Sequence, residues 1–197
     1  MKNSKLIILC LTAFLVSLFN LSLAQTVTLS QLDIQRVAVA KNTGTTTGTK
    51  FYLNGTPSGL VSALGSALSV TTEYSEMNEV NQTVYKFNGA EFTFEGNTLV
   101  DFHISNSNYY VIINNIVDST NPFKYYFKVG DSLSRLSTLH SGSYNAKEEK
   151  RLFFQIYRTE TTYVEEFGKI KPVTKKILLD NALLFEHNSG VITGFYF

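Results

Sequence analysis

The stretch VYKFNGAEFTFEGNTLVDFHI, residues 84–104, decides the fold. Apolar and polar side chains alternate on both sides of Asn88-Gly89, a dipeptide that favours a tight hairpin because both residues tolerate positive φ. A second turn signal, Gly96-Asn97, separates the second alternating run from the third. The stretch therefore predicts a three-stranded antiparallel meander with one apolar and one polar face. The apolar face requires a second layer to cover it.

A helix predicted just upstream is the candidate for this second layer. Thr56 is a good N-cap, and Pro57 follows it at the first helical position, where the missing N–H costs nothing. Leu60 and Leu64, together with Val61 and Leu68, give this helix an apolar side at helical spacing.

The order strand, glycine, helix and meander then occurs a second time. At a constant offset of 75 residues, Gly130 corresponds to Gly55. The final stretch LLFEHNSGVITGFYF, residues 183–197, has the same Phe-Glu, short turn and aliphatic order as FTFEGNTLVDFHI, residues 92–104. We interpret this as one unit used twice.

The chain is accordingly divided into four parts. Residues 1–24 form a signal peptide, and residues 25–50 form an N-terminal strand and a flexible loop. Residues 51–122 and 123–197 form the two repeat units, and an insertion at about 159–175 predicts a longer polar hairpin arm in the second. The predicted fold class is α+β: two tandem units of a helix plus an antiparallel meander, with the helices packed on one face of a sheet.

The helix entry GTPSGLVSALG, residues 55–65, resembles that of SmpA/OmlA-type envelope proteins, in which a glycine opens a short helix that ends in Leu-Gly before the sheet. The tandem arrangement, over residues 51–197, resembles β-lactamase-inhibitor-protein-like repeats. The resemblance implies helices on one side of an antiparallel sheet, and protein binding rather than catalysis. The second unit departs from the motif at His140, which stands where the first has Gly65, and no binding residue is carried over.

The signal peptide is predicted from its three regions. Lys2 and Lys5 give a positive start, residues 6–19 are an almost unbroken apolar run, and SLA at residues 22–24 supplies the small residues that signal peptidase reads. The run is short for a membrane-spanning helix, which needs about 20 apolar residues. We therefore expect export, with cleavage after residue 24 and no membrane insertion of the mature chain.

The sole cysteine, Cys10, lies within this leader, so the mature chain has no thiol, disulfide or thiolate metal site. Export without disulfides suits a bacterial envelope, and we expect a periplasmic or extracellular protein of a Gram-negative bacterium. Cleavage takes the 17 basic residues to 15, by loss of Lys2 and Lys5, against 16 acidic ones. This nearly neutral charge gives no indication that the protein binds nucleic acid or an anionic membrane surface.

The sequence contains no recognisable catalytic or metal-binding motif. The three histidines, His103, His140 and His187, have no tight spacing with carboxylates that would indicate a metal site. No Gly-x-Ser-x-Gly elbow or phosphate loop is present. Paired carboxylates at 148–149 and 165–166 are typical of solvated loops or strand ends. The sequence thus predicts no catalytic residue, no metal and no cofactor.

The polar face of the meander remains as the candidate partner surface. Residues of the first unit on this face include Lys86, Asp101 and His103. In the second unit, simple alternation puts Ile192, Gly194 and Tyr196 on the core face. The residues that it leaves for the outer face are Leu184, Thr193, Phe195 and Phe197. An apolar outer face indicates a partner surface, unless the N-terminal segment or the arm covers it.

The sequence therefore predicts an exported, non-catalytic module that binds a protein through the outer sheet face. Two alternatives stay open. Length and aromatic content also suit a small outer-membrane β-barrel, although two helix signals and short strands oppose it. A hydrolase of cell-wall or sugar substrates is the weaker alternative, since no constellation of residues supports it.

Overall fold

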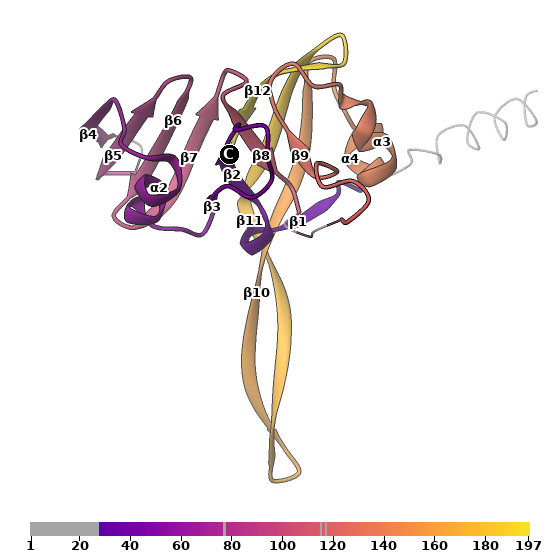
Figure 1. Cartoon of the computed structure of the whole chain (residues 1–197). Coiled ribbons are helices and arrows are strands. Elements are labelled where there is room, and N and C mark those ends of the chain that lie inside the picture. The colour runs from indigo at the N-terminus through magenta and orange to yellow at the C-terminus, as the bar shows by residue number, and fades with distance from the viewer. Residues whose placement is uncertain (1–27, 77, 115, 117) are drawn as a thin grey trace, which may run out of the picture.

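The structure is a computed structural model that describes residues 28–76, 78–114, 116 and 118–197. The predicted signal peptide and Cys10 lie outside these residues. The described part of the chain is mostly β, with 52% of its residues in strands and 14% in helices. The described strands form an eight-stranded sheet, here called sheet A, and a four-stranded sheet, here called sheet B (Figure 1).

All neighbouring strands in the two sheets are antiparallel except β1, which lies parallel to β10. Across sheet A the strands are β1 (Gln31–Asp33), β10 (Arg151–Glu166), β11 (Lys169–Asn188), β12 (Val191–Tyr196), β7 (Thr98–Ile104), β6 (Ala90–Glu95), β5 (Val80–Phe87) and β4 (Ser69–Ser75). Across sheet B they are β3 (Lys50–Tyr52), β2 (Ala38–Lys41), β8 (Tyr109–Ile112) and β9 (Tyr126–Phe127). The helical segments are η1 (Ile34–Arg36), α2 (Pro57–Leu64), η2 (Leu133–Arg135), α3 (Leu136–Leu139) and α4 (Ser141–Asn145).

The predicted meander is confirmed as β5, β6 and β7. Phe92 pairs with Tyr85 on one side and with Phe102 on the other, so the strands run in the expected antiparallel order. Phe92 and Phe102 are fully buried, as apolar alternation requires. Thr56 also caps α2 as predicted, because its hydroxyl accepts a hydrogen bond from the Gly59 N–H at 3.4 Å.

The predicted α+β class, with helix-plus-meander units and helices packed on a sheet, is wrong. Sheet B is the main layer over sheet A, and α2, α3 and α4, the short α-helices of the described residues, lie to either side of it (Figure 1). The Phe51 ring of β3 packs edge-on against the Phe92 ring at 5.8 Å. α2 contacts β2 and β3, and its buried Leu60 and Leu64 join the same core. The helices are too short to cover the sheet alone, since α3 has 4 residues and α4 has 5.

In each sheet, the strands are arranged in a similar order on the two sides of a central antiparallel pair. In sheet A the centre is β12 beside β7, flanked by β11 and β10 on one side and by β6 and β5 on the other. In sheet B the centre is β2 beside β8, flanked by β3 and β9. One continuous core contains residues of both halves. The unit boundaries at 51–122 and 123–197 stay a prediction.

The hairpins β6–β7 and β11–β12 match in detail. Each has a two-residue turn, and each has one extra residue in its second strand, a β-bulge, two positions after that strand begins. The bulge residues are Val100 in β7 and Thr193 in β12, which are 93 positions apart. At this offset His103 corresponds to Tyr196, and these two residues pair directly across the centre of sheet A.

The predicted long hairpin arm is confirmed. The outer parts of β10 and β11 leave the body of the protein as a two-stranded ribbon (Figure 1). Its tip is the turn Phe167-Gly168, in which both residues have positive φ, 53° and 71°. The arm starts where Tyr157 pairs with Leu178.

Candidate functional site

One row of side chains crosses the face of sheet A that points away from sheet B. Directly paired residues of neighbouring strands share a face, so strand register alone defines the row. We call it the outer-face row; from β4 to β10 it contains Ser69, Lys86, Glu91, His103, Tyr196, Leu184 and Phe153. It joins both halves of the chain into one surface.

The middle of the outer-face row is a ring stack. The rings of His103 and Tyr196 lie 4.3 Å apart, centroid to centroid, with 11° between their planes. Both side chains are half-buried. The Tyr196 hydroxyl donates to Oε2 of Glu186 at 3.4 Å, which fixes the far end of the ring. Burial, and then the charge of Glu186, raise the pKa of Tyr196, so the phenol is neutral and stays a donor at ordinary pH.

Charged groups lie around this stack. Lys86 Nζ and Glu91 Oε2 form an ion pair at 3.4 Å within the row. Asp101 stands two positions before His103 on the same face of β7, and its side chain is exposed. Neighbouring atoms nevertheless desolvate its carboxyl, and this raises the pKa of Asp101; the nearby His103 opposes the shift and Glu91 adds to it.

The apolar end of the row lies on β11 and β10. Leu184 pairs with Tyr196 on one side and with Phe153 on the other, and all three are half-buried. The outer face therefore changes from charged at Lys86 and Glu91 to aromatic and aliphatic at Leu184 and Phe153. Such a surface offers a partner both an apolar contact and oriented charges.

The prediction that Phe195 and Phe197 lie on the outer face is wrong. Phe195 is completely buried, and its ring packs edge-on against Phe185 at 4.7 Å. Phe197 stacks on Phe102 in the core, with ring centroids 5.9 Å apart. The bulge at Thr193 is the physical cause, because one extra residue reverses the alternation for everything after it.

Four of the seven predicted partner-binding residues lie on the outer face as expected: Lys86, Asp101, His103 and Leu184. Thr193 is exposed, but it is the bulge residue and lies outside the row. Sequence reasoning missed Tyr196, which simple alternation had assigned to the core. It also missed Phe153, whose place is set by pairing with Leu184.

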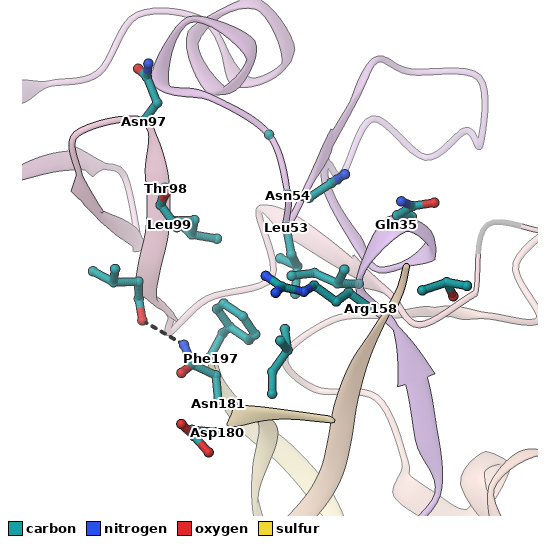
Figure 2. Close-up of a pocket in the computed structure, with 15 residues that line it drawn as sticks. Gln35, Leu53, Asn54, Asn97, Thr98, Leu99, Arg158, Asp180, Asn181 and Phe197 are labelled. Carbon is teal, nitrogen blue, oxygen red and sulfur yellow. Dashed lines mark hydrogen bonds between the residues drawn. The ribbon is translucent and has the colours of Figure 1, made fainter. Parts of the chain in front are cut away.

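A separate hollow lies at the base of the arm, with a cavity volume of about 550 Å³ (Figure 2). Leu53, Leu99 and Phe197 supply apolar walls, while Arg158 and Asn181 supply polar ones. Both polar groups already have protein partners. A guanidinium nitrogen of Arg158 lies 2.7 Å from Glu160 Oε1, and the Asn181 amide donates to the Val100 carbonyl at 3.2 Å. The cavity is large enough for a small molecule, and the carboxylate of Asp180 also lines it.

The three histidines lie apart. His103 is on the outer face, whereas His187 is buried and neither of its ring nitrogens has a hydrogen-bond partner among the described atoms. His140 lies at the junction of α3 and α4 with its ring edge-on to Phe154 at 5.3 Å, and burial lowers the pKa of His140. Within the described residues, no three His, Cys, Asp or Glu side chains come together to hold a metal ion.

Comparison with known proteins gives no match: no family model, no curated protein and no solved structure is similar to the chain. The resemblance to SmpA/OmlA-type proteins therefore stays a prediction. Among the described residues, no helix is long and apolar enough to cross a membrane.

Proposed function

We propose that the protein is an exported, non-catalytic binding module that holds another protein on the outer face of sheet A. The outer-face row carries this proposal. It places three half-buried apolar and aromatic side chains, Tyr196, Leu184 and Phe153, side by side on a regular sheet. Aromatic side chains in a partly desolvated centre, surrounded by charges, are typical of protein interfaces.

Several features support the specificity of such a contact. The His103–Tyr196 stack and the Tyr196–Glu186 hydrogen bond hold the central rings in one orientation before binding. Preorganised side chains lose little entropy when a partner docks. The Lys86–Glu91 pair in the row and Asp101 beside His103 would orient the partner.

The place of action is proposed from the leader sequence. Residues 1–24 direct export, and a mature chain without cysteine suits the periplasm or the exterior of a Gram-negative bacterium. The partner is then another envelope or secreted protein. Neither nucleic acid nor a cofactor enters the proposed activity, because the mature charge is nearly balanced and the sequence carries no cofactor motif.

Affinity capture from envelope extracts tests the proposal. Leu184→Glu places a carboxylate in the apolar part of the row on a half-buried site, so it should abolish capture while the fold is retained. Leu68→Glu is the matched control, because Leu68 is an equally apolar but exposed residue outside the row. Equal capture by wild type and Leu184→Glu would contradict the proposed surface. Loss of capture by both variants would point to charge in general rather than to the row.

A further inference from the structure

The arm of β10 and β11 is a free ribbon. β1 covers the outer edge of β10 only as far as Tyr157, and β12 covers β11 only from Leu184 onward. Between these points, among the described residues, neither strand of the arm has a third strand beside it. An isolated two-stranded hairpin in water is marginally stable, so a ribbon of this length needs a further contact.

The exposed apolar residues of the arm gather near its tip. Phe167 is 96% exposed, and Tyr163 and Ile170 are 74% and 73% exposed. Phe167 also has φ 53°, a conformation that a bulky residue adopts only at a cost of about 1–3 kcal/mol. Asn or Gly would fit the same turn without this strain. The exposed and strained Phe167 is therefore the residue of the arm on which a contact would be built.

The two edges of the arm differ. The outer edge of β11 carries Pro172, which has no N–H, together with Lys169, Lys171, Lys175 and Lys176. Proline and lysine are the residues that block strand addition at a sheet edge. The outer edge of β10 has no proline and is rich in residues that favour strands, Thr159, Thr161, Thr162, Tyr163 and Val164. Only the β10 edge is therefore open to another strand.

The ladder identifies the backbone groups on this open edge. The two-residue turn makes Glu166 and Lys169 a hydrogen-bonded pair of the antiparallel ladder, and such pairs alternate along the hairpin. Thr161, Tyr163 and the other odd-numbered residues of the arm in β10 consequently have their N–H and C=O groups on the outer edge. Pro172, paired with Tyr163, falls on the outer edge of β11, where its missing N–H is tolerated.

We propose that the β10 edge of the arm pairs with the β10 edge of a second copy of this chain, antiparallel and about a two-fold axis at Thr162. Two independent features select this register. Tyr157 is already paired with Asp33 of β1, so the added strand cannot reach past Arg158. A shift of the axis outward to Tyr163 would place Glu160 opposite Glu166 of the second copy, and like charges directly opposite are destabilising.

With the axis at Thr162 the charges are complementary. Arg158 lies opposite Glu166 of the second copy, and the same pair recurs at the other end of the interface. Within each arm Arg158 also contacts Glu160 and Glu166 also contacts Lys171, so the contact between copies joins two existing ion pairs of opposite polarity. Thr162 faces itself across the axis, a favourable cross-strand pair. The tip Phe167 of each copy then lies at the base of the other arm, next to Arg158 and the cavity of about 550 Å³ that Arg158 lines. This contact involves a surface separate from the outer-face row and goes beyond the proposed function.

A pair of proline variants tests the edge. Thr161 and Thr174 are directly opposite each other, both are exposed, and their hydroxyl oxygens lie 3.3 Å apart. Thr161→Pro removes an outward N–H from the β10 edge, whereas Thr174→Pro removes the equivalent group from the β11 edge. In analytical ultracentrifugation of the purified protein, Thr161→Pro should weaken dimer formation at least tenfold, and Thr174→Pro should leave it unchanged. A wild type that is monomeric at about 1 mM, or equal effects of the two variants, would overturn the proposal.

A mixing experiment tests the register and does not depend on proline. Arg158→Glu and Glu166→Arg should each dimerise poorly alone, because each places like charges opposite each other. A mixture of the two should form heterodimers on the order of tenfold more tightly, since both pairs become complementary. Any effect that a substitution has within its own arm is the same in the homodimer and in the heterodimer, so it does not affect the comparison of their affinities. If the two variants form homodimers and heterodimers in statistical proportion, the proposed register is refuted. If the arm binds a different protein and the chain does not self-associate, a second copy is not the partner of this edge.

Phe167→Trp reports on the tip, because the chain contains no tryptophan. Its emission should shift to shorter wavelength as the protein concentration rises through the dimer range. Val191→Trp, at an exposed position outside the arm, is the control that should not shift. A Phe167→Trp emission that is independent of concentration would contradict the predicted burial of the tip.

Discussion

Replacement of Phe195 by alanine tests the bulge at Thr193 most directly. Phe195 is completely buried and packs edge-on against Phe185 at 4.7 Å. Truncation of a buried phenylalanine costs about 3–5 kcal/mol through lost transfer energy and the cavity left behind. The edge-to-face contact accounts for about 0.5–1.5 kcal/mol of this. Because the site lies in the centre of the shared core, little collapse is expected, and we place the loss in the upper half of the range.

The matched control is the next residue. Tyr196→Ala removes a similar ring from the opposite face of the same strand, where it is half-buried and stacked on His103. We expect this change to cost about 1 kcal/mol, close to the average for point substitutions. Urea unfolding followed by circular dichroism measures both, and the slope of the transition should stay unchanged. If Phe195→Ala costs no more than Tyr196→Ala, the alternation has not reversed at Thr193 and the reasoning fails.

Two further predictions concern single polar residues in sheet A. Asp101→Asn should raise the melting temperature at pH 7, because the raised folded-state pKa of Asp101 means that its ionised carboxyl is less favourable in the folded than in the unfolded protein. This gain in melting temperature should shrink as the pH falls through the folded-state pKa and vanish below the unfolded-state pKa of about 3.9. A gain that is the same at pH 7 and pH 3 would contradict the prediction. His187→Phe should stabilise the protein by about 1–3 kcal/mol, because both ring nitrogens of His187 are buried with no hydrogen-bond partner in the described part of the chain, and the corresponding residue of the other hairpin is Phe94. A loss of stability in urea unfolding would show that the histidine has a partner or that the site cannot hold a larger ring.

Local signals in the sequence predicted the parts of the fold that short segments decide. Alternation and the glycine turns were sufficient for the meander, and Thr56 with Pro57 was sufficient for the start of α2. The hairpin arm was also predictable, since it is a long run of strand residues around one turn. In each case the contacts that form the element join residues close in sequence.

Sheet B could not be predicted in the same way. Its central pairing joins Ala38 to Ile112, so the partners are far apart and nothing local selects them. The candidate site was half right for a related reason. A strand's register depends on its neighbour, and the extra residue Thr193 leaves no mark on the alternation of the sequence itself.

The pairing of β7 with β12 has a consequence for what the outer face can recognise. If two identical single units were joined at this seam, every side chain on the face would have a twin, and only a symmetric target would match both halves. In one continuous chain the two positions are encoded separately, and His103 faces Tyr196 where a symmetric assembly would place two copies of one residue. Covalent linkage also keeps the halves at a high effective concentration, so substitutions at the seam need not preserve association between free subunits. The two halves of the face can therefore carry different side chains, and such an asymmetric face can bind a target in one orientation only.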